Sequence, residues 1–208
     1  MKNIVVLVSG GGTNLQALIN AEKNGEIVNG KITCVVSSNE KAYALERARQ
    51  NDITTRVIKR KGFDNQQDYD DALTALLTEE KADLVVLAGF MTIFGGSVIN
   101  TFENRIINIH PSLIPSFCGK GFYGLHVHEE ALNRGVKLTG ATAHFVNEIC
   151  DGGPIIMQKA VEIQPNDTPE VLQKRVMEQA EWKILPQSVS LFCQDKLSVK
   201  DGKVIISD

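Results

Sequence analysis

The sequence predicts an α/β protein with a Rossmann-like, mostly parallel twisted sheet and helices on both faces. Three observations lead to this prediction. The chain opens with the apolar run Ile4–Val8, which is typical of a central parallel strand buried on both faces. A glycine-rich turn and a helical pattern follow the run. Strand and helix patterns then alternate with no evident repeat or linker, which indicates a parallel sheet covered by helices.

Each element of the first half is predicted from its own residue pattern. Leu15, Leu18 and Ile19 recur at helical spacing, so a helix is expected from about Asn14. Runs of β-branched residues predict strands at 31–37 and 54–58, and helical spacing predicts a helix over 42–51. The leucines of residues 68–80 predict another helix with a core-facing stripe, and residues 84–88 predict a buried strand.

The second half continues the alternation. Strands are expected at 106–110, 139–146 and 155–161, and a helix from about 128 to 134. Residues 116–124 contain three glycines and predict a flexible surface loop. Asp167–Glu170 is a typical helix start, and this helix is expected to end before Pro186. Leu197–Ile206 is expected to form a hairpin with an Asp-Gly turn.

Composition limits the class of protein. A chain of 208 residues fits one domain, so residues 1–208 are expected to form a single unit. The net charge of −3 argues against a nucleic-acid binder. No apolar run approaches the ~20 residues that span a bilayer, and the N-terminus lacks the pattern of a signal peptide. The four cysteines are widely separated without CxxC spacing, so we expect reduced thiols, no zinc site and a cytoplasmic protein.

All four histidines lie within residues 106–154, so we expect the chemistry there. Asn108 and His110 share one face of a predicted strand, at the end where open α/β sheets hold ligands. An amide donor beside an imidazole suits stabilisation of an oxyanion, although a polar, water-facing strand end fits the same residues. His126 and His128 alone do not make a case for a metal site.

Two turns add candidate residues. Asp151 opens an Asp-Gly-Gly-Pro turn and is a candidate general base or proton relay, and a purely turn-forming aspartate is the alternative. If ionised near His110, it would favour the imidazolium. Residues 10–14 combine a glycine-rich turn with a helix start, which predicts a phosphate site, although a simple tight turn also fits. The turn matches neither GxGxxG nor a P-loop, so NAD and ATP are not indicated.

Four ordered motifs together resemble the folate-dependent formyltransferases. They are Val8–Leu18, Asp83–Met91, Asn108–Pro115, and His144–Val146 followed by Asp151–Pro154. The resemblance runs from about residue 3 to about residue 190 and is greatest to members that act on glycinamide ribonucleotide. It implies formyl transfer from the co-substrate 10-formyltetrahydrofolate to the amine of that ribonucleotide in purine biosynthesis. It also implies direct attack through an oxyanion intermediate, without a metal.

The resemblance also implies the roles of individual residues. Residues 1–100 would bind the nucleotide phosphate, and residues 101–190 would carry the catalytic and folate-site residues. The implied catalytic residues are Asn108, His110 and Asp151, with His144 in support. The implied phosphate and ribose residues are Gly11, Gly12, Thr13, Asn14 and Glu181. The implied folate wall consists of Phe90, Met91, Thr92, Ile93, Phe94, Asn108, Asn147, Glu148 and Asp151.

The sequence departs from the family pattern at three positions. Thr92 and Gln66 stand where the family often has arginines near the benzoyl-glutamate part of the folate. Glu181 is followed by Trp182 instead of the family's histidine, and its distance along the chain from Arg175 is one residue longer.

Three other functions use similar residues. Hydrolysis of 10-formyltetrahydrofolate would use the same three catalytic residues with water as acceptor, but such hydrolases usually carry an N-terminal regulatory domain that we do not expect here. Transfer to initiator tRNA would normally need a C-terminal RNA-binding domain, also not expected. A non-catalytic nucleotide-binding module is the third alternative, against which the intact Asn108, His110 and Asp151 argue. We expect a monomer or a homodimer.

Overall fold

A seven-stranded sheet with the order β3-β2-β1-β4-β5-β6-β7 forms the centre of the computed structural model, which describes residues 1–207. The strands β1 to β5 pair in parallel, and β6 pairs antiparallel with both β5 and β7. The bounds are β1 Lys2–Val8, β2 Gly30–Ser37, β3 Thr54–Val57, β4 Leu84–Leu87, β5 Ile106–His110, β6 Leu138–Phe145 and β7 Ile155–Glu162. The mostly parallel sheet predicted from the sequence is confirmed.

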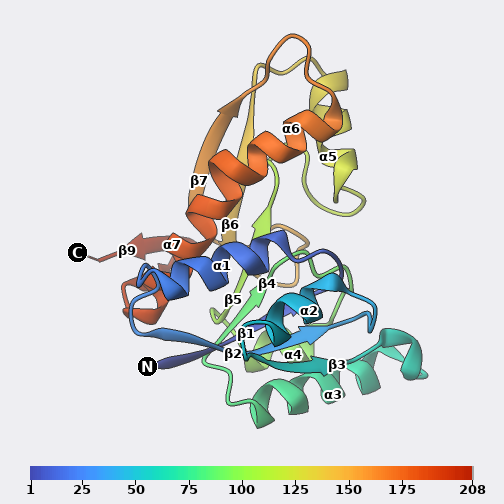
Figure 1. The fold of residues 1–208 in the computed structure, drawn as a ribbon, viewed down its shortest axis with the longest axis vertical. Helices are drawn as coiled ribbons and strands as arrows, with labels where there is room; N and C mark the ends of the chain where they lie inside the picture. The colour runs from blue at the N-terminus through green and yellow to red at the C-terminus, as the bar shows by residue number, and fades with distance from the viewer. Residues whose placement is uncertain (208) are drawn as a thin grey trace.

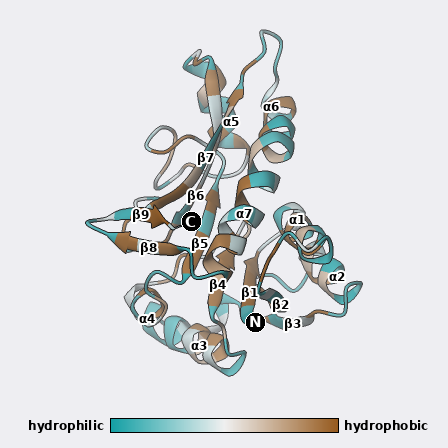
Figure 2. Cartoon of the chain, turned by 90° about the vertical axis from the view of Figure 1, so that its left-hand side faces the viewer, coloured by the Kyte–Doolittle hydropathy of each residue, from teal (hydrophilic) through white to brown (hydrophobic). Residues whose placement is uncertain are grey.

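Helices cover both faces of the sheet because each central strand is apolar on both sides. Ile4, Val6 and Val8 of β1 belong to one core cluster, and Val5 and Leu7 belong to the other. The first face carries α1 Thr13–Lys23, α2 Tyr43–Arg49, α6 Pro169–Val176 and α7 Trp182–Cys193, and the second carries α3 Gln66–Glu79 and α4 Gly96–Thr101. Figure 2 shows apolar residues concentrated in the strands and polar residues in the outer loops.

The molecule is elongated (Figure 1). One end holds β1–β3 with α2–α4, and the other holds the far ends of β6 and β7 with α6 and with α5, Leu125–Asn133. A short 3-10 turn, Arg60–Gly62, precedes α3. No helix within residues 1–207 is long and apolar enough to cross a membrane.

The last helical region corrects one prediction. The helix does not end before Pro186: α6 continues through a π-helical stretch, Met177–Glu181, into α7, which contains Pro186. Pro186 is buried, and its neighbours Leu185 and Val189 pack into the first core cluster. This packing outweighs the backbone hydrogen bond that a proline inside a helix removes. A π-helical stretch accommodates one extra residue in a helix, which matches the longer spacing between Arg175 and Glu181.

Two smaller differences concern helix bounds. The six-residue α4 was not predicted, because Gly96–Thr101 carries neither a capping side chain nor a long apolar stripe. The helix expected from about residue 128 begins at Leu125. The predicted hairpin is confirmed as β8 Leu197–Lys200 and β9 Lys203–Ile206. Its turn residues have φ angles of 51° and 71°, as a tight Asp-Gly hairpin turn requires.

Candidate active site

The strand order reverses between β1 and β4, and loops that follow these strands meet at the C-terminal edge of the sheet. The glycine-rich loop follows β1, and the predicted folate segment follows β4. The backbone N–H of Met91 donates to Ser9 Oγ at 2.8 Å, so the two loops are joined directly. Ligands of doubly wound sheets bind at such a reversal.

Sheet register brings the predicted catalytic residues together from segments far apart in the sequence. Asn108 on β5 lies directly opposite His144 on β6. Asp151 stands in the turn that follows β6, with φ of +55°. That turn is tight: a Cβ on Gly153 would lie 1.8 Å from the carbonyl oxygen of Phe145, so only glycine fits there. The chain is therefore folded back so that the Asp151 carboxylate reaches the end of β5.

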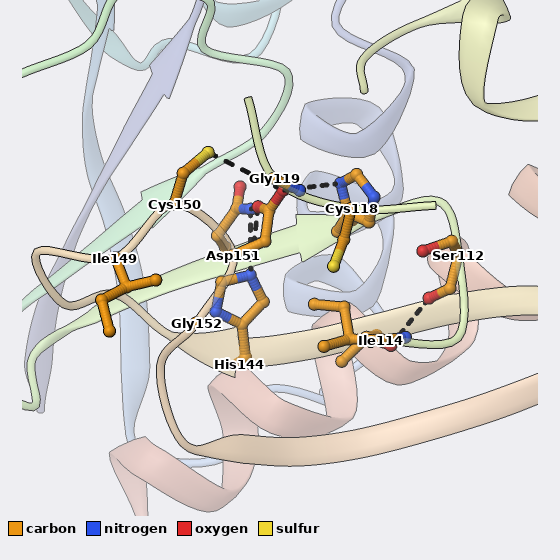
Figure 3. A network of polar contacts seen from close by, with 12 residues as sticks. Ser112, Ile114, Cys118, Gly119, His144, Ile149, Cys150, Asp151 and Gly152 are labelled. Atoms are coloured by element: carbon orange, nitrogen blue, oxygen red, sulfur yellow. Dashed lines mark hydrogen bonds and ion pairs between the residues drawn. The ribbon is translucent and has the colours of Figure 1, made fainter. Parts of the chain in front are cut away.

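The Asp151 carboxylate is held by several groups (Figure 3). The backbone N–H of Gly119 donates to Oδ2 at 2.8 Å, and Asn108 Nδ2 lies 3.4 Å from Oδ1. The imidazoles of His110 and His144 approach the carboxylate at 3.6 Å and 3.7 Å. The structure thus brings Asn108, His110, His144 and Asp151 together in one polar cluster.

The ring nitrogens of His144 have distinct partners. His144 Nδ1 lies 2.8 Å from the carbonyl oxygen of Phe145, so this nitrogen carries the proton. In the neutral ring Nε2 then has a lone pair, which accepts from Asn108 Nδ2 at 3.2 Å. His144 therefore orients the side-chain amide of Asn108 so that its NH₂ group, and not its oxygen, points toward the cluster.

His110 is fixed in a complementary way. Its Nε2 donates to the carbonyl oxygen of Phe117 at 2.8 Å, and its Nδ1 faces Asp151 Oδ2. Burial lowers the pKa of His110, and it outweighs the opposing effects of the Asp151 charge and the Phe117 carbonyl. We expected Asp151 to favour the imidazolium. The structure contains that attraction, but the loss of solvent is the larger effect, so His110 is neutral near pH 7 with its Nδ1 lone pair toward Asp151.

The carboxylate of Asp151 is ionised. Burial by itself raises the pKa of Asp151, but the two adjacent imidazoles and the Gly119 N–H, which donates to Oδ2, bring the pKa below its usual value. An ionised carboxylate beside a neutral imidazole is a pair that can receive and pass on a proton.

The loop of residues 116–124 completes this cluster with backbone groups. We predicted a flexible surface loop, and Lys120 at its tip is exposed. Phe117 and Gly119, however, contact His110 and Asp151 directly. No side-chain pattern indicated these two contacts, and the three glycines of the loop were the only signal of an unusual backbone.

The glycine-rich loop has the form of an anion site. Gly12 precedes α1 with φ of +73°, and within residues 1–207 no side chain caps this helix. The N–H groups of its first turn therefore remain available, and Gly11 and Thr13 are exposed. Such an arrangement favours a phosphate group.

Glu181 lies beside this loop despite the extra residue before it. Asn14 Nδ2 donates to Glu181 Oε2 at 2.7 Å, because the π-helical stretch absorbs the insertion. Glu181 is buried with no cationic partner among residues 1–207, and burial raises the pKa of this carboxyl to about 7.

The predicted folate residues fall into two groups. Met91 and Ile93 are 54% and 76% exposed and are free to contact a ligand, whereas Phe94 is buried in the second core cluster. A Cβ on Gly96 would lie 3.5 Å from Glu148 Oε1, so the turn of residues 147–151 adjoins the segment of residues 90–96.

Gln66 holds the folate segment from α3. Its Nε2 donates to Asp70 Oδ1 at 2.7 Å and to the Ile93 carbonyl at 3.2 Å. Asp70 Oδ2 in turn accepts from the Gly95 N–H at 2.8 Å. Where the sequence comparison led us to look for an arginine, Gln66 therefore supplies hydrogen bonds within the protein and no positive charge.

The remaining histidines do not form a ligand cluster. His126 is exposed and lies 3.3 Å from Glu129, whereas His128 is fully buried. Within residues 1–207, no group of three His, Cys, Asp or Glu side chains is placed to hold a metal ion.

The α/β fold thus carries an anion site after β1 and, at the end of β5, a cluster of a carboxylate, two imidazoles and an amide, which is an arrangement suited to an enzyme of group transfer. Comparisons with known proteins specify the class further. The model of the family described as "Formyl transferase" matches residues 2–189. The chain belongs to this family, and it is a one-carbon transferase, as the sequence motifs predicted.

Individual relatives are similar to this chain over nearly its whole length. Phosphoribosylglycinamide formyltransferase of Haemophilus influenzae is 42% identical over 97% of this chain and 92% of its own. The crystal structure of glycinamide ribonucleotide transformylase 1 from Symbiobacterium toebii has a TM-score of 0.93 and 39% identity, covering 100% of this chain and 95% of that one. A formyltetrahydrofolate deformylase from Pseudomonas syringae has a TM-score of 0.88 and 28% identity, and this chain covers 66% of it.

Proposed function

We propose that the chain transfers the formyl group of 10-formyltetrahydrofolate to the amine of glycinamide ribonucleotide, a step of purine biosynthesis. The observation that carries this proposal is the contact of Asn108, His110 and Asp151 at the end of β5, in a chain similar over nearly its whole length to phosphoribosylglycinamide formyltransferase. The anion site follows β1 and the exposed apolar segment follows β4, at the same edge of the parallel sheet as this cluster, and the two suit the two substrates.

The ribonucleotide would bind with its phosphate on the N–H groups of Gly11, Gly12 and Thr13. The free first turn of α1 and the positive end of its dipole support this placement. Glu181 and Asn14 lie next to the loop and would accept and donate hydrogen bonds to the ribose hydroxyls. The chain thus offers charge recognition at the phosphate and directional recognition at the sugar.

The folate would lie between the segment of residues 90–94 and the turn of residues 147–151. Met91 and Ile93 supply exposed apolar surface, and the backbone of the turn supplies polar groups, which together suit a flat heteroaromatic ring. Thr92, Asn147 and Glu148 line the same space in this proposal. The formyl group would then reach Asn108, His110 and Asp151.

In the first step the amine attacks the formyl carbon, and the carbonyl oxygen becomes an oxyanion. Asn108 is oriented by His144 and donates through Nδ2. The contact of Asn108 Nδ2 with Asp151 at 3.4 Å is longer than its contact with His144 at 3.2 Å, so the amide hydrogen that faces Asp151 is the one that turns to the oxyanion. A donor held in place before the reaction stabilises the charge as it develops.

The attacking amine must lose a proton, and N10 of the folate must gain one. Asp151 accepts the proton, directly or through water, and passes it to the Nδ1 lone pair of His110 at 3.6 Å. The resulting imidazolium is paired with Asp151 and adds a positive charge beside the oxyanion. When the bond between the formyl carbon and N10 breaks, N10 takes the proton, so the pair returns to its starting state.

Hydrolysis of the same formyl folate is the second candidate, favoured by the likeness to the Pseudomonas syringae deformylase. The test is spectroscopic: the protein is mixed with 10-formyltetrahydrofolate and glycinamide ribonucleotide, and loss of the formyl group is followed with each substrate omitted in turn. Loss that requires the ribonucleotide supports the transferase. Loss without it refutes the transferase and supports the hydrolase.

The proposed steps require no metal ion. We propose that the protein works in the cytoplasm as a single-domain monomer or homodimer. Sedimentation of the purified protein at working concentration would distinguish the two states.

A further inference from the structure

We propose that Arg47, on α2, is a positioning residue for the ribonucleotide phosphate. It fixes the orientation of the glycine-rich loop and does not itself belong to the catalytic cluster. The proposal rests on the phosphate assignment made above for Gly11–Thr13. Three contacts on the side of the loop that faces α2 carry it.

Two consecutive carbonyl groups of the loop are held by α2. The N–H of Ala44 donates to the carbonyl oxygen of Gly10 at 3.1 Å. Arg47 Nε donates to the carbonyl oxygen of Gly11 at 2.9 Å. A trans peptide is planar, and its C=O and N–H groups point in opposite directions. The N–H groups of Gly11 and Gly12 therefore point away from α2, to the side where a phosphate would sit.

With Arg47 in place, the glycine-rich loop has little freedom to rotate on the side that faces α2. A Cβ on Gly12 would lie 2.6 Å from Ala44 Cβ, so α2 packs directly against the loop and only glycine fits. Without Arg47, the peptide between Gly11 and Gly12 would lose its only hydrogen bond to α2 among residues 1–207. Glycines flank that peptide on both sides, and their flexibility would let it turn.

Arg47 also connects the loop to the helix that follows it. Its Nη1 donates to Gln16 Oε1 at 3.0 Å, and Gln16 lies on the second turn of α1. The guanidinium stacks over the ring of Tyr43 at 5.0 Å. The rigid fork of the guanidinium makes these bonds at once, whereas a lysine at this position would make one of them at most.

The neighbouring arginine offers a matched control. Arg49 lies on the same helix, its side chain is 58% exposed, and its recorded ion pair is with Glu46 at 3.8 Å. Arg47→Ala and Arg49→Ala remove the same charge from the same helix, but only the first releases the loop. A comparison of the two separates positioning from a general effect of positive charge.

The experiment measures kcat, both KM values, and the inhibition constant of ribose 5-phosphate for wild type, Arg47→Ala, Arg47→Lys and Arg49→Ala. In Arg47→Ala we expect the KM for the ribonucleotide and the inhibition constant to rise by about tenfold or more, as expected when bonds to a charged group are weakened. We expect the KM for the folate to stay within about twofold, since within residues 1–207 the hydrogen bonds of Arg47 go to the glycine-rich loop and to α1, and none goes to the folate segment. Arg47→Lys should fall between wild type and Arg47→Ala, and Arg49→Ala should match wild type.

Three results would overturn the proposal. They are an unchanged ribonucleotide KM in Arg47→Ala, an equal increase in Arg49→Ala, or an equal rise in both KM values of Arg47→Ala. Failure of the proposed function is distinguishable, because the wild-type protein would then not turn over the ribonucleotide. Calorimetric titration with ribose 5-phosphate would still compare the four proteins in that case, and equal affinities would refute the role of Arg47.

Discussion

Replacement of His128 by phenylalanine tests how a buried imidazole affects stability. His128 lies on α5 with 0% of its surface exposed, and neither ring nitrogen has a hydrogen-bond partner within residues 1–207. Burial, with an addition from the charge of His110, lowers the pKa of His128 from 6.5 to about 4. The folded state therefore holds this ring neutral, and the unfolded state binds the proton more readily.

The sign and size of the effect follow from these two pKa values. The free energy of unfolding is highest above pH 6.5, and it falls as the pH decreases toward 4, because only the unfolded state gains the proton. The full difference is about 3 kcal/mol, of which about 2 kcal/mol is lost between pH 7 and pH 5. Phenylalanine has a similar flat shape and no proton to bind, so this part of the pH dependence should disappear.

The assay is urea unfolding at several pH values from 5 to 8, with the free energy obtained by linear extrapolation. His126→Phe is the control, because His126 lies on the same helix but is exposed. We expect the curve of His128→Phe to be flatter than wild type by about 2 kcal/mol, and the curve of His126→Phe to follow wild type. Parallel curves for wild type and His128→Phe would refute the assignment of the pH dependence to this residue.

Three further predictions concern the site. His110→Ala and Asp151→Asn should each lower turnover by more than about 100-fold with unchanged circular dichroism, and near-normal turnover would exclude the role given to that residue. Burial raises the pKa of Glu181 to about 7, so the wild-type protein loses stability as the pH rises from 4.5 through 7. At pH 8 the free energy of unfolding of Glu181→Gln should exceed that of wild type by about 3 kcal/mol, and equal values would contradict this. Gly153→Ala would place a Cβ 1.8 Å from the Phe145 carbonyl and should destabilise the protein by at least about 2 kcal/mol in thermal unfolding.

Elements that repeat a short pattern could be predicted from the sequence. The run Ile4–Val8 predicted a strand buried on both faces, and its side chains do enter both core clusters. Asn108 and His110 were placed on one face of a strand by alternation, which depends only on local geometry. The passage of α7 through Pro186 could not be predicted, because it depends on apolar packing between segments distant in the sequence.

The position of Glu181 shows a different limit. Its longer spacing from Arg175 put its role in question, because a regular α-helix would turn the side chain by about 100° with each added residue. The π-helical stretch of residues 177–181 absorbs the added residue, and Glu181 meets Asn14. Sequence spacing alone cannot distinguish an inserted residue that rotates the rest of a helix from an inserted residue that a local π-helical stretch accommodates.

The loop of residues 116–124 explains why the catalytic cluster was only partly predictable. Residue types indicated His110 and Asp151, but the groups that orient them are the carbonyl of Phe117 and the N–H of Gly119, which any residue type could supply. Thr142 on β6 fixes the segment that leads into this loop: its Oγ1 donates to the carbonyl of Ser112 at 2.7 Å. The protonation of His110 therefore depends on where the loop lies, because the Phe117 carbonyl binds its Nε2 and raises its pKa. A change that displaces the loop would remove the acceptor of His110 and the donor to Asp151 together, so the two residues should lose their roles as a pair.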